Sequence, residues 1–141
     1  MPKLTAALCL PLLLAGALAA GDDPEPKARA VQPREIAVAG LPRVNGQYDK
    51  PISIPSERHL AELVPNEQTR RAILKQVNFE KERLLLFCWF GSPRDSLVPA
   101  KSKAGEANFE ITRAPAKKAV LQARLFAVPA RAKVKVTEKA E

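Results

Sequence analysis

The strongest hydrophobic signal in the body of the chain is a run of seven consecutive apolar residues at positions 84–90. Side chains alternate between the two faces of a strand, so a run without polar positions predicts a strand that is covered on both faces. Gly91 and Pro93 follow at once and favour a loop. We therefore expect residues 84–90 to form the central strand of the fold.

Two later stretches alternate strictly between apolar and polar residues, at positions 107–111 and 132–136. This period of two predicts half-buried strands. The lysines of the second stretch favour the edge of a sheet, where charge discourages pairing with other chains. Residues 116–128 between them fit two structures: they are good helix formers, yet every second residue from 121 to 127 is apolar. We predict a strand there, joined to the last strand as a hairpin through Pro129 and Ala130.

Ahead of the apolar run, hydrophobic residues recur at spacings of three and four, as on one face of a helix. Leu60, Leu63 and Val64 stand at i, i+3 and i+4 behind Ser56, which predicts a short N-capped amphipathic helix ended by Pro65. Asn66 similarly predicts the cap of a second helix that runs to about residue 76, and residues 52–54 should be extended. The expected fold is a single α+β domain over residues 50–138, with two short N-terminal helices packed on an antiparallel β-meander.

The N-terminus carries a pattern of a different kind. Lys3 precedes an apolar run over residues 8–18, and small residues at 17 and 19 complete a cleavage signal. This combination predicts a secretory signal peptide over residues 1–19 that is cleaved after Ala19, so the mature protein is expected to be secreted or periplasmic. No later stretch is long and apolar enough for a transmembrane segment. The charged, proline-rich residues 20–49 predict a disordered tether.

Cysteine and histidine usage limits the chemistry. After cleavage Cys88 is the only cysteine, which excludes an intramolecular disulfide. Its apolar neighbours indicate burial and an inert thiol. His59 is the only histidine and falls in the first turn of the predicted helix, where an exposed, non-catalytic role is favoured. We therefore predict no catalytic residues, no metal site and no cofactor.

The formal net charge is +8, and the basic excess lies late in the chain. A stripe of Arg131, Lys133 and Lys135 could meet anionic polymers or phospholipid headgroups, although a charged edge strand explains it more simply. Nucleic acid is disfavoured by the export signal and by the lack of aromatic residues among the basic ones.

One loop combines residue types that are common at binding sites. Trp89 precedes the glycine turn, and Arg94 and Asp95 follow it. Trp and Arg are over-represented at interface hot spots, so this loop is a candidate contact for a protein partner. The alternative, which we favour, is that Trp89 faces the helices and the loop is only a connection.

The order of these motifs resembles two protein groups. The segment Val77-Asn78-Phe79-Glu80-Lys81-Glu82, which runs into the apolar strand, is similar to the C-terminal domain of PrcB-type protease-complex subunits. Trp89, Gly91, Ser92 and Asp95 resemble the strand end of small exported planctomycete-type proteins of unassigned activity, although Pro93 departs from that pattern. The resemblance covers residues 50–137; it implies the fold and transfers no chemistry.

Together these observations favour an exported, non-enzymatic domain that acts as a protein–protein interaction module of the cell envelope or extracellular space. The second hypothesis is an electrostatic binder of acidic surface polymer or phospholipid headgroups, whose affinity would fall steeply with salt. The third is an exported hydrolase, which the single histidine disfavours.

Overall fold

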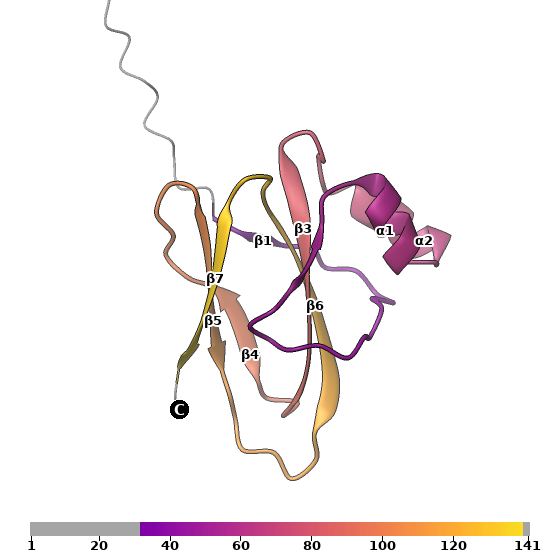
Figure 1. Cartoon of the computed structure of the whole chain (residues 1–141). Helices are drawn as coiled ribbons and strands as arrows, with labels where there is room; N and C mark the ends of the chain where they lie inside the picture. Colours follow the sequence, from indigo (N-terminus) through magenta and orange to yellow (C-terminus); the bar gives the residue numbers. More distant parts are fainter. Residues whose placement is uncertain (1–31, 140–141) are drawn as a thin grey trace, which may run out of the picture.

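The computed structural model describes residues 32–139, and within them the chain forms two short helices and seven strands in two sheets (Figure 1). The predicted signal peptide, its cleavage after Ala19 and the first part of the predicted tether lie outside the described residues. No helix of residues 32–139 is long and apolar enough to cross a membrane.

The first sheet has four antiparallel strands in the order β1-β6-β3-β2, and the second has three strands in the order β4-β5-β7. The strands of the first sheet are β1 (Arg34–Glu35), β2 (Ile52–Ile54), β3 (Glu82–Gly91) and β6 (Val120–Pro129). Those of the second sheet are β4 (Ser96–Pro99), β5 (Glu106–Thr112) and β7 (Lys133–Lys139). The helices α1 (Glu57–Leu63) and α2 (Glu67–Leu74) form a third layer beside the first sheet.

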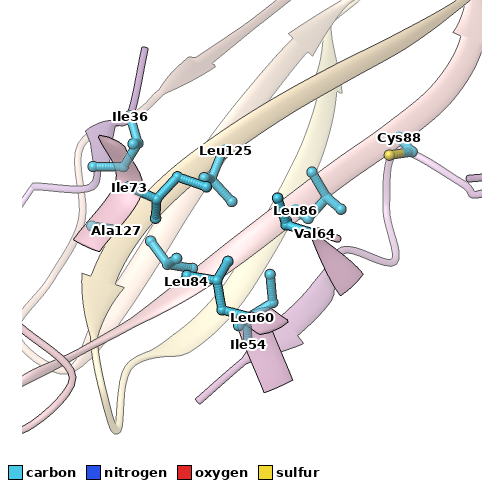
Figure 2. Close-up of a cluster of buried hydrophobic side chains, with 10 residues drawn as sticks. All are labelled: Ile36, Ile54, Leu60, Val64, Ile73, Leu84, Leu86, Cys88, Leu125 and Ala127. Carbon is cyan, nitrogen blue, oxygen red and sulfur yellow. The ribbon is translucent and has the colours of Figure 1, made fainter. Parts of the chain in front are cut away.

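The apolar run forms the inner strand β3, as predicted. Leu84, Leu86 and Cys88 project into a helix-side core that also contains Leu60 and Ile73 (Figure 2). Leu85, Phe87 and Trp89 point the other way, into an inter-sheet core. In that core the rings of Phe87, Phe109 and Phe126 pack with centroids 4.8 to 5.7 Å apart. Both faces of β3 are therefore covered from Leu84 to Trp89.

Both helices begin where the sequence indicates. The Ser56 side chain accepts a hydrogen bond from the His59 N–H, and the Asn66 side chain accepts one from the Thr69 N–H, so each satisfies an amide that the first turn leaves free. Leu60 and Ile73 are fully buried against β3 and β6. The α+β class and the two capped helices are confirmed.

The antiparallel meander is only partly confirmed, and the hairpin between the last two strands is wrong. Residues 120–129 do form a strand, but β6 pairs with β3 and β1 in the first sheet. β7 instead lies parallel to β5 at the edge of the second sheet. The reason is burial: four successive residues of β6, 125–128, are buried, and a strand covered on both faces belongs inside a sheet.

The folded domain also includes residues ahead of the predicted boundary near residue 50. β1 pairs with β6, and the Ile36 N–H donates to Leu125 O at 2.8 Å. Ile36 is 1% exposed, and Val38, Leu41 and Val44 pack against the helix-side core. These scattered apolar residues cover the part of the first sheet that two short helices leave open. Residues 32–49 are thus part of the domain rather than a tether.

Candidate functional site

Two of the predicted contact residues lie inside the fold. Trp89 and Asp95 are 1% and 5% exposed, and Trp89 Nε1–H donates to Asp95 Oδ2 at 3.1 Å. Trp89 therefore faces the second sheet, not the helices as we had favoured. The Asp95 carboxylate also accepts from the Ala114 N–H at 2.9 Å and meets Arg113 Nε at 3.4 Å. Trp89 and Asp95 thus help close the end of the sandwich, and their side chains present almost no surface to a partner.

The turn that leads to Asp95 requires its glycine. A Cβ on Gly91 would come within 1.9 Å of Asp95 Oδ2. Ser92, which is buried, accepts from the Asp95 N–H through its carbonyl and from the Arg94 N–H through its hydroxyl. Pro93 and Arg94 are the exposed residues of this turn.

The predicted basic stripe lies at a different place. Lys133 and Lys135 are exposed on β7, and the register sets Lys133 beside Glu106 of β5. Further along the same pair of strands, Lys139 Nζ lies 3.8 Å from Glu110 Oε1. Arg131 is exposed in the connection after β6, and that connection lies at the opposite end of the β3–β6 pair from Arg94. The structure thus separates Arg94 from the stripe and interleaves the lysines with acids.

Sequence reasoning missed Phe90. This residue ends the apolar run and is 54% exposed, although coverage on both faces was expected up to that position. Phe90 lies opposite Leu121 of β6. It is on the same face of β3 as Leu84, Leu86 and Cys88, which belong to the helix-side core. The only sequence signal for this exposure was that Phe90 stands immediately before Gly91, at the end of the strand.

The edge of β3 beside Phe90 is open. Opposite residues of antiparallel strands alternate between pairs that exchange hydrogen bonds and pairs that do not. Leu125 O accepts from Ile36 of the neighbouring segment, so Leu125 and Leu86 form a pair that does not exchange hydrogen bonds. The N–H and C=O groups of Leu86 therefore point away from β6. Phe90 lies four residues further along β3, so its N–H and C=O groups point the same way. β2 reaches only as far as Leu86. Within residues 32–139, Phe90 O accepts from Arg113 Nη2 at 3.4 Å, and no acceptor is found for the Phe90 N–H on that side.

A hollow of about 360 Å³ adjoins this edge. We call it the aromatic hollow, and it is lined by Gly46, Gln47, Tyr48, Asp49, Trp89, Phe90 and Arg113. The Arg113 guanidinium lies 5.3 Å from the centre of the Tyr48 ring, and Tyr48 OH donates to Glu138 Oε2 at 2.5 Å. That hydrogen bond raises the pKa of Tyr48, helped by slight desolvation and by the negative charges of Glu138 and Asp49. The wall opposite Phe90 is therefore held in place by side-chain contacts.

A second hollow of about 290 Å³ opens at the same end of the sandwich. We call it the basic hollow, and it is lined by Ser92, Pro93, Arg94, Pro115, Ala116, Lys117 and Lys118. Three of these residues are exposed cations and none is acidic. No sequence pattern indicates this grouping, because Arg94 and Lys117 come from different loops that only the fold brings together.

His59 and Cys88, the residues considered for catalysis, each make a contact within the fold. Ser56 Oγ lies 2.8 Å from His59 Nδ1, but the same oxygen caps α1, and the pair is on the exposed first turn. Cys88 is buried, and its thiol points to Pro42 O at 3.6 Å. No group of three or more His, Cys, Asp or Glu that could hold a metal occurs in the described part of the chain.

No family model, no curated protein and no solved structure matches this chain. The resemblance to PrcB-type domains and to small exported planctomycete-type proteins therefore stays a prediction.

Proposed function

We propose that this protein is an exported, non-enzymatic binding module for a protein partner, and that the aromatic hollow is its contact surface. The observation that carries the proposal is Phe90, an aromatic side chain 54% exposed beside an open strand edge. Large apolar side chains at the surface of a hollow are typical anchors of protein interfaces.

The surroundings of Phe90 add two features that suit a protein ligand. Its N–H, for which no acceptor is found among residues 32–139, can donate one backbone hydrogen bond to a partner segment. The hollow of about 360 Å³ beside it has the size to receive a partner side chain. The contacts of Tyr48 with Glu138 and Arg113 hold the wall of this hollow, which limits the ordering cost on binding.

The test is site-specific photocrosslinking in the native host. A photoreactive phenylalanine analogue in place of Phe90 should give one discrete adduct with a protein, and Phe90→Ser should abolish co-purification of that protein. Intact mass of the protein before crosslinking should correspond to a chain that starts at Ala20, which also tests export.

The matched control is Val98. It is the other large apolar residue exposed within residues 32–139, at 45%, and it lies on β4 of the second sheet. The same analogue at position 98 should give no such adduct, and Val98→Ser should leave co-purification unchanged. Equal crosslinking from both positions, or none from position 90, would overturn the proposal.

Binding of acidic surface polymer or phospholipid headgroups remains the second hypothesis. It relied on the stripe of Arg131, Lys133 and Lys135, and such ligands need an uninterrupted basic surface. On β7, Lys133 lies opposite Glu106 of β5, and Lys139 approaches Glu110 of the same strand. This mixed charge favours the protein partner.

A further inference from the structure

The basic hollow is not explained by the fold or by the contact at Phe90. Buried hydrogen bonds account for Asp95 and Trp89 behind it, but Arg94, Lys117 and Lys118 project from its rim into solvent. Clustered like charges repel each other, so this grouping does not stabilise the fold. Because these cations converge from two loops, the basic hollow is a candidate binding site for an anion.

The local charge is uncompensated. Arg113, the fourth cation of this end, is neutralised by Asp95, whose side chain is fully buried. No such acid lies among the residues that line the hollow. The field at its mouth is therefore positive, in contrast to β7, where Lys133 neighbours Glu106 and Lys139 approaches Glu110. An anionic group is the complementary ligand.

The walls of the basic hollow narrow the class of anion. Pro93, Pro115 and Ala116 contribute much of its surface, so a ligand that also carries an apolar side chain gains from burial there. A phosphate polymer or a headgroup offers only hydrophilic surface. An acidic peptide with an apolar residue uses both the cations and the prolines.

Residues 113–115 contribute to the walls of both hollows. Arg113 lines the aromatic hollow, and Pro115 lines the basic one. Two residues of extended chain span at most about 7 Å. Lining residues of the two hollows are therefore near neighbours, which allows one partner protein to contact both hollows.

We infer that the basic hollow binds an acidic segment of the protein partner, with glutamate or aspartate side chains on Arg94, Lys117 and Lys118 and an apolar side chain against the prolines. This inference rests on the proposed function and adds the chemistry of the partner. It places the determinant of specificity in two loops that the sequence separates by about twenty residues.

The probe is a synthetic pentapeptide in which two glutamates stand on each side of one phenylalanine. Titrated into ¹⁵N-labelled protein, it should give saturable amide shifts centred on residues 92–94 and 115–118. The double variant Lys117→Glu/Lys118→Glu should weaken binding by about tenfold or more, since each change replaces an attraction with a repulsion. A peptide with serine in place of phenylalanine should bind more weakly than the parent.

The matched control is Lys133→Glu/Lys135→Glu, which changes the net charge by the same amount on the mixed-charge face. It should leave the affinity within about twofold at physiological salt, where separated surface charges are screened. Equal weakening by both double variants, or shifts that never saturate, would overturn the inference. So would tripolyphosphate binding at the same residues as tightly as the peptide, because it would assign the hollow to a polyanion.

The two proposals can fail separately. If the peptide binds as described and crosslinking from position 90 fails, the contact at Phe90 is wrong and the basic hollow stands. If crosslinking succeeds and the peptide shows no site-specific binding, only the acidic character of the partner is wrong.

Discussion

Asp95 shows how one buried carboxylate can organise a whole end of the molecule. Its two oxygens receive the Trp89 indole N–H, the Ala114 amide and the Arg113 guanidinium, so one side chain ties together β3, the loop after it and the loop after β5. A buried charge is tolerated only when it is paired and hydrogen-bonded in this way. The positions of Phe90 and Arg94 on either side of the turn follow from this anchor.

Replacing Asp95 by alanine should therefore lower the free energy of unfolding by about 3 kcal/mol, because it leaves buried donors without their acceptor. Asp49→Ala is the control, since Asp49 is exposed and should change stability by about 0.5 kcal/mol or less. Urea unfolding of both variants beside the wild type measures the difference. Similar values for the two would show that Asp95 is not an anchor.

Trp89, Arg94 and Asp95 lie within six residues of each other in the sequence, but their order alone does not decide which of them is exposed. The pattern of apolar residues indicates that β3 is buried, and a buried indole needs an acceptor for its N–H. Six residues of separation do not reveal that Asp95 turns back to supply that acceptor. The grouping of Arg94 with Lys117 and Lys118 was beyond sequence reasoning, because no local rule relates loops from different strands.

At the scale of elements, local sequence signals were sufficient to locate most helices and strands, but they did not determine which strands pair. Capping residues, prolines and hydrophobic period located both helices and the strands β2, β3, β5 and β7. The partner of β6 was mistaken because the short connection after it also suits a hairpin. The buried residues 125–128 of β6 were the better guide, since their burial on both faces requires neighbours in a sheet and in two cores.

β3 offers a test of this three-layer arrangement. Leu86→Ala and Phe87→Ala should each cost about 2 to 5 kcal/mol, because one side chain fills the helix-side core and the other the inter-sheet core. Phe90→Ala, on the same strand, should cost about 1 kcal/mol or less, because its side chain is largely exposed. Thermal or urea unfolding separates these outcomes. A mild effect at Phe87 would mean that the second sheet does not cover β3.

At the scale of the whole molecule, the layers depend on a segment that looks like a linker. Prolines and polar residues dominate residues 32–49, so composition predicts disorder. Composition averages over the segment, however, whereas burial depends on a few positions. Ile36 is buried against Leu125 and Ala127, and Gly46 comes so close to Cys88 that a Cβ there would lie 2.7 Å from Cys88 O. The segment thus completes the helix-side core and also supplies the wall of the aromatic hollow.

A chain that begins at residue 50 should therefore be much less stable than one that begins at residue 32. Burial of Ile36 alone contributes about 2 kcal/mol, and a domain of this size has only about 5 to 15 kcal/mol to lose. Urea unfolding of the two truncated chains measures the loss, and the longer chain should match the full-length protein. Ile36→Ala in the full chain isolates the contribution of one side chain, with Ala37→Ser as the control at an exposed neighbour. Unchanged stability of the shorter chain would restore the reading of residues 32–49 as a tether, and the aromatic hollow would then lose the fixed wall on which the proposed contact at Phe90 depends.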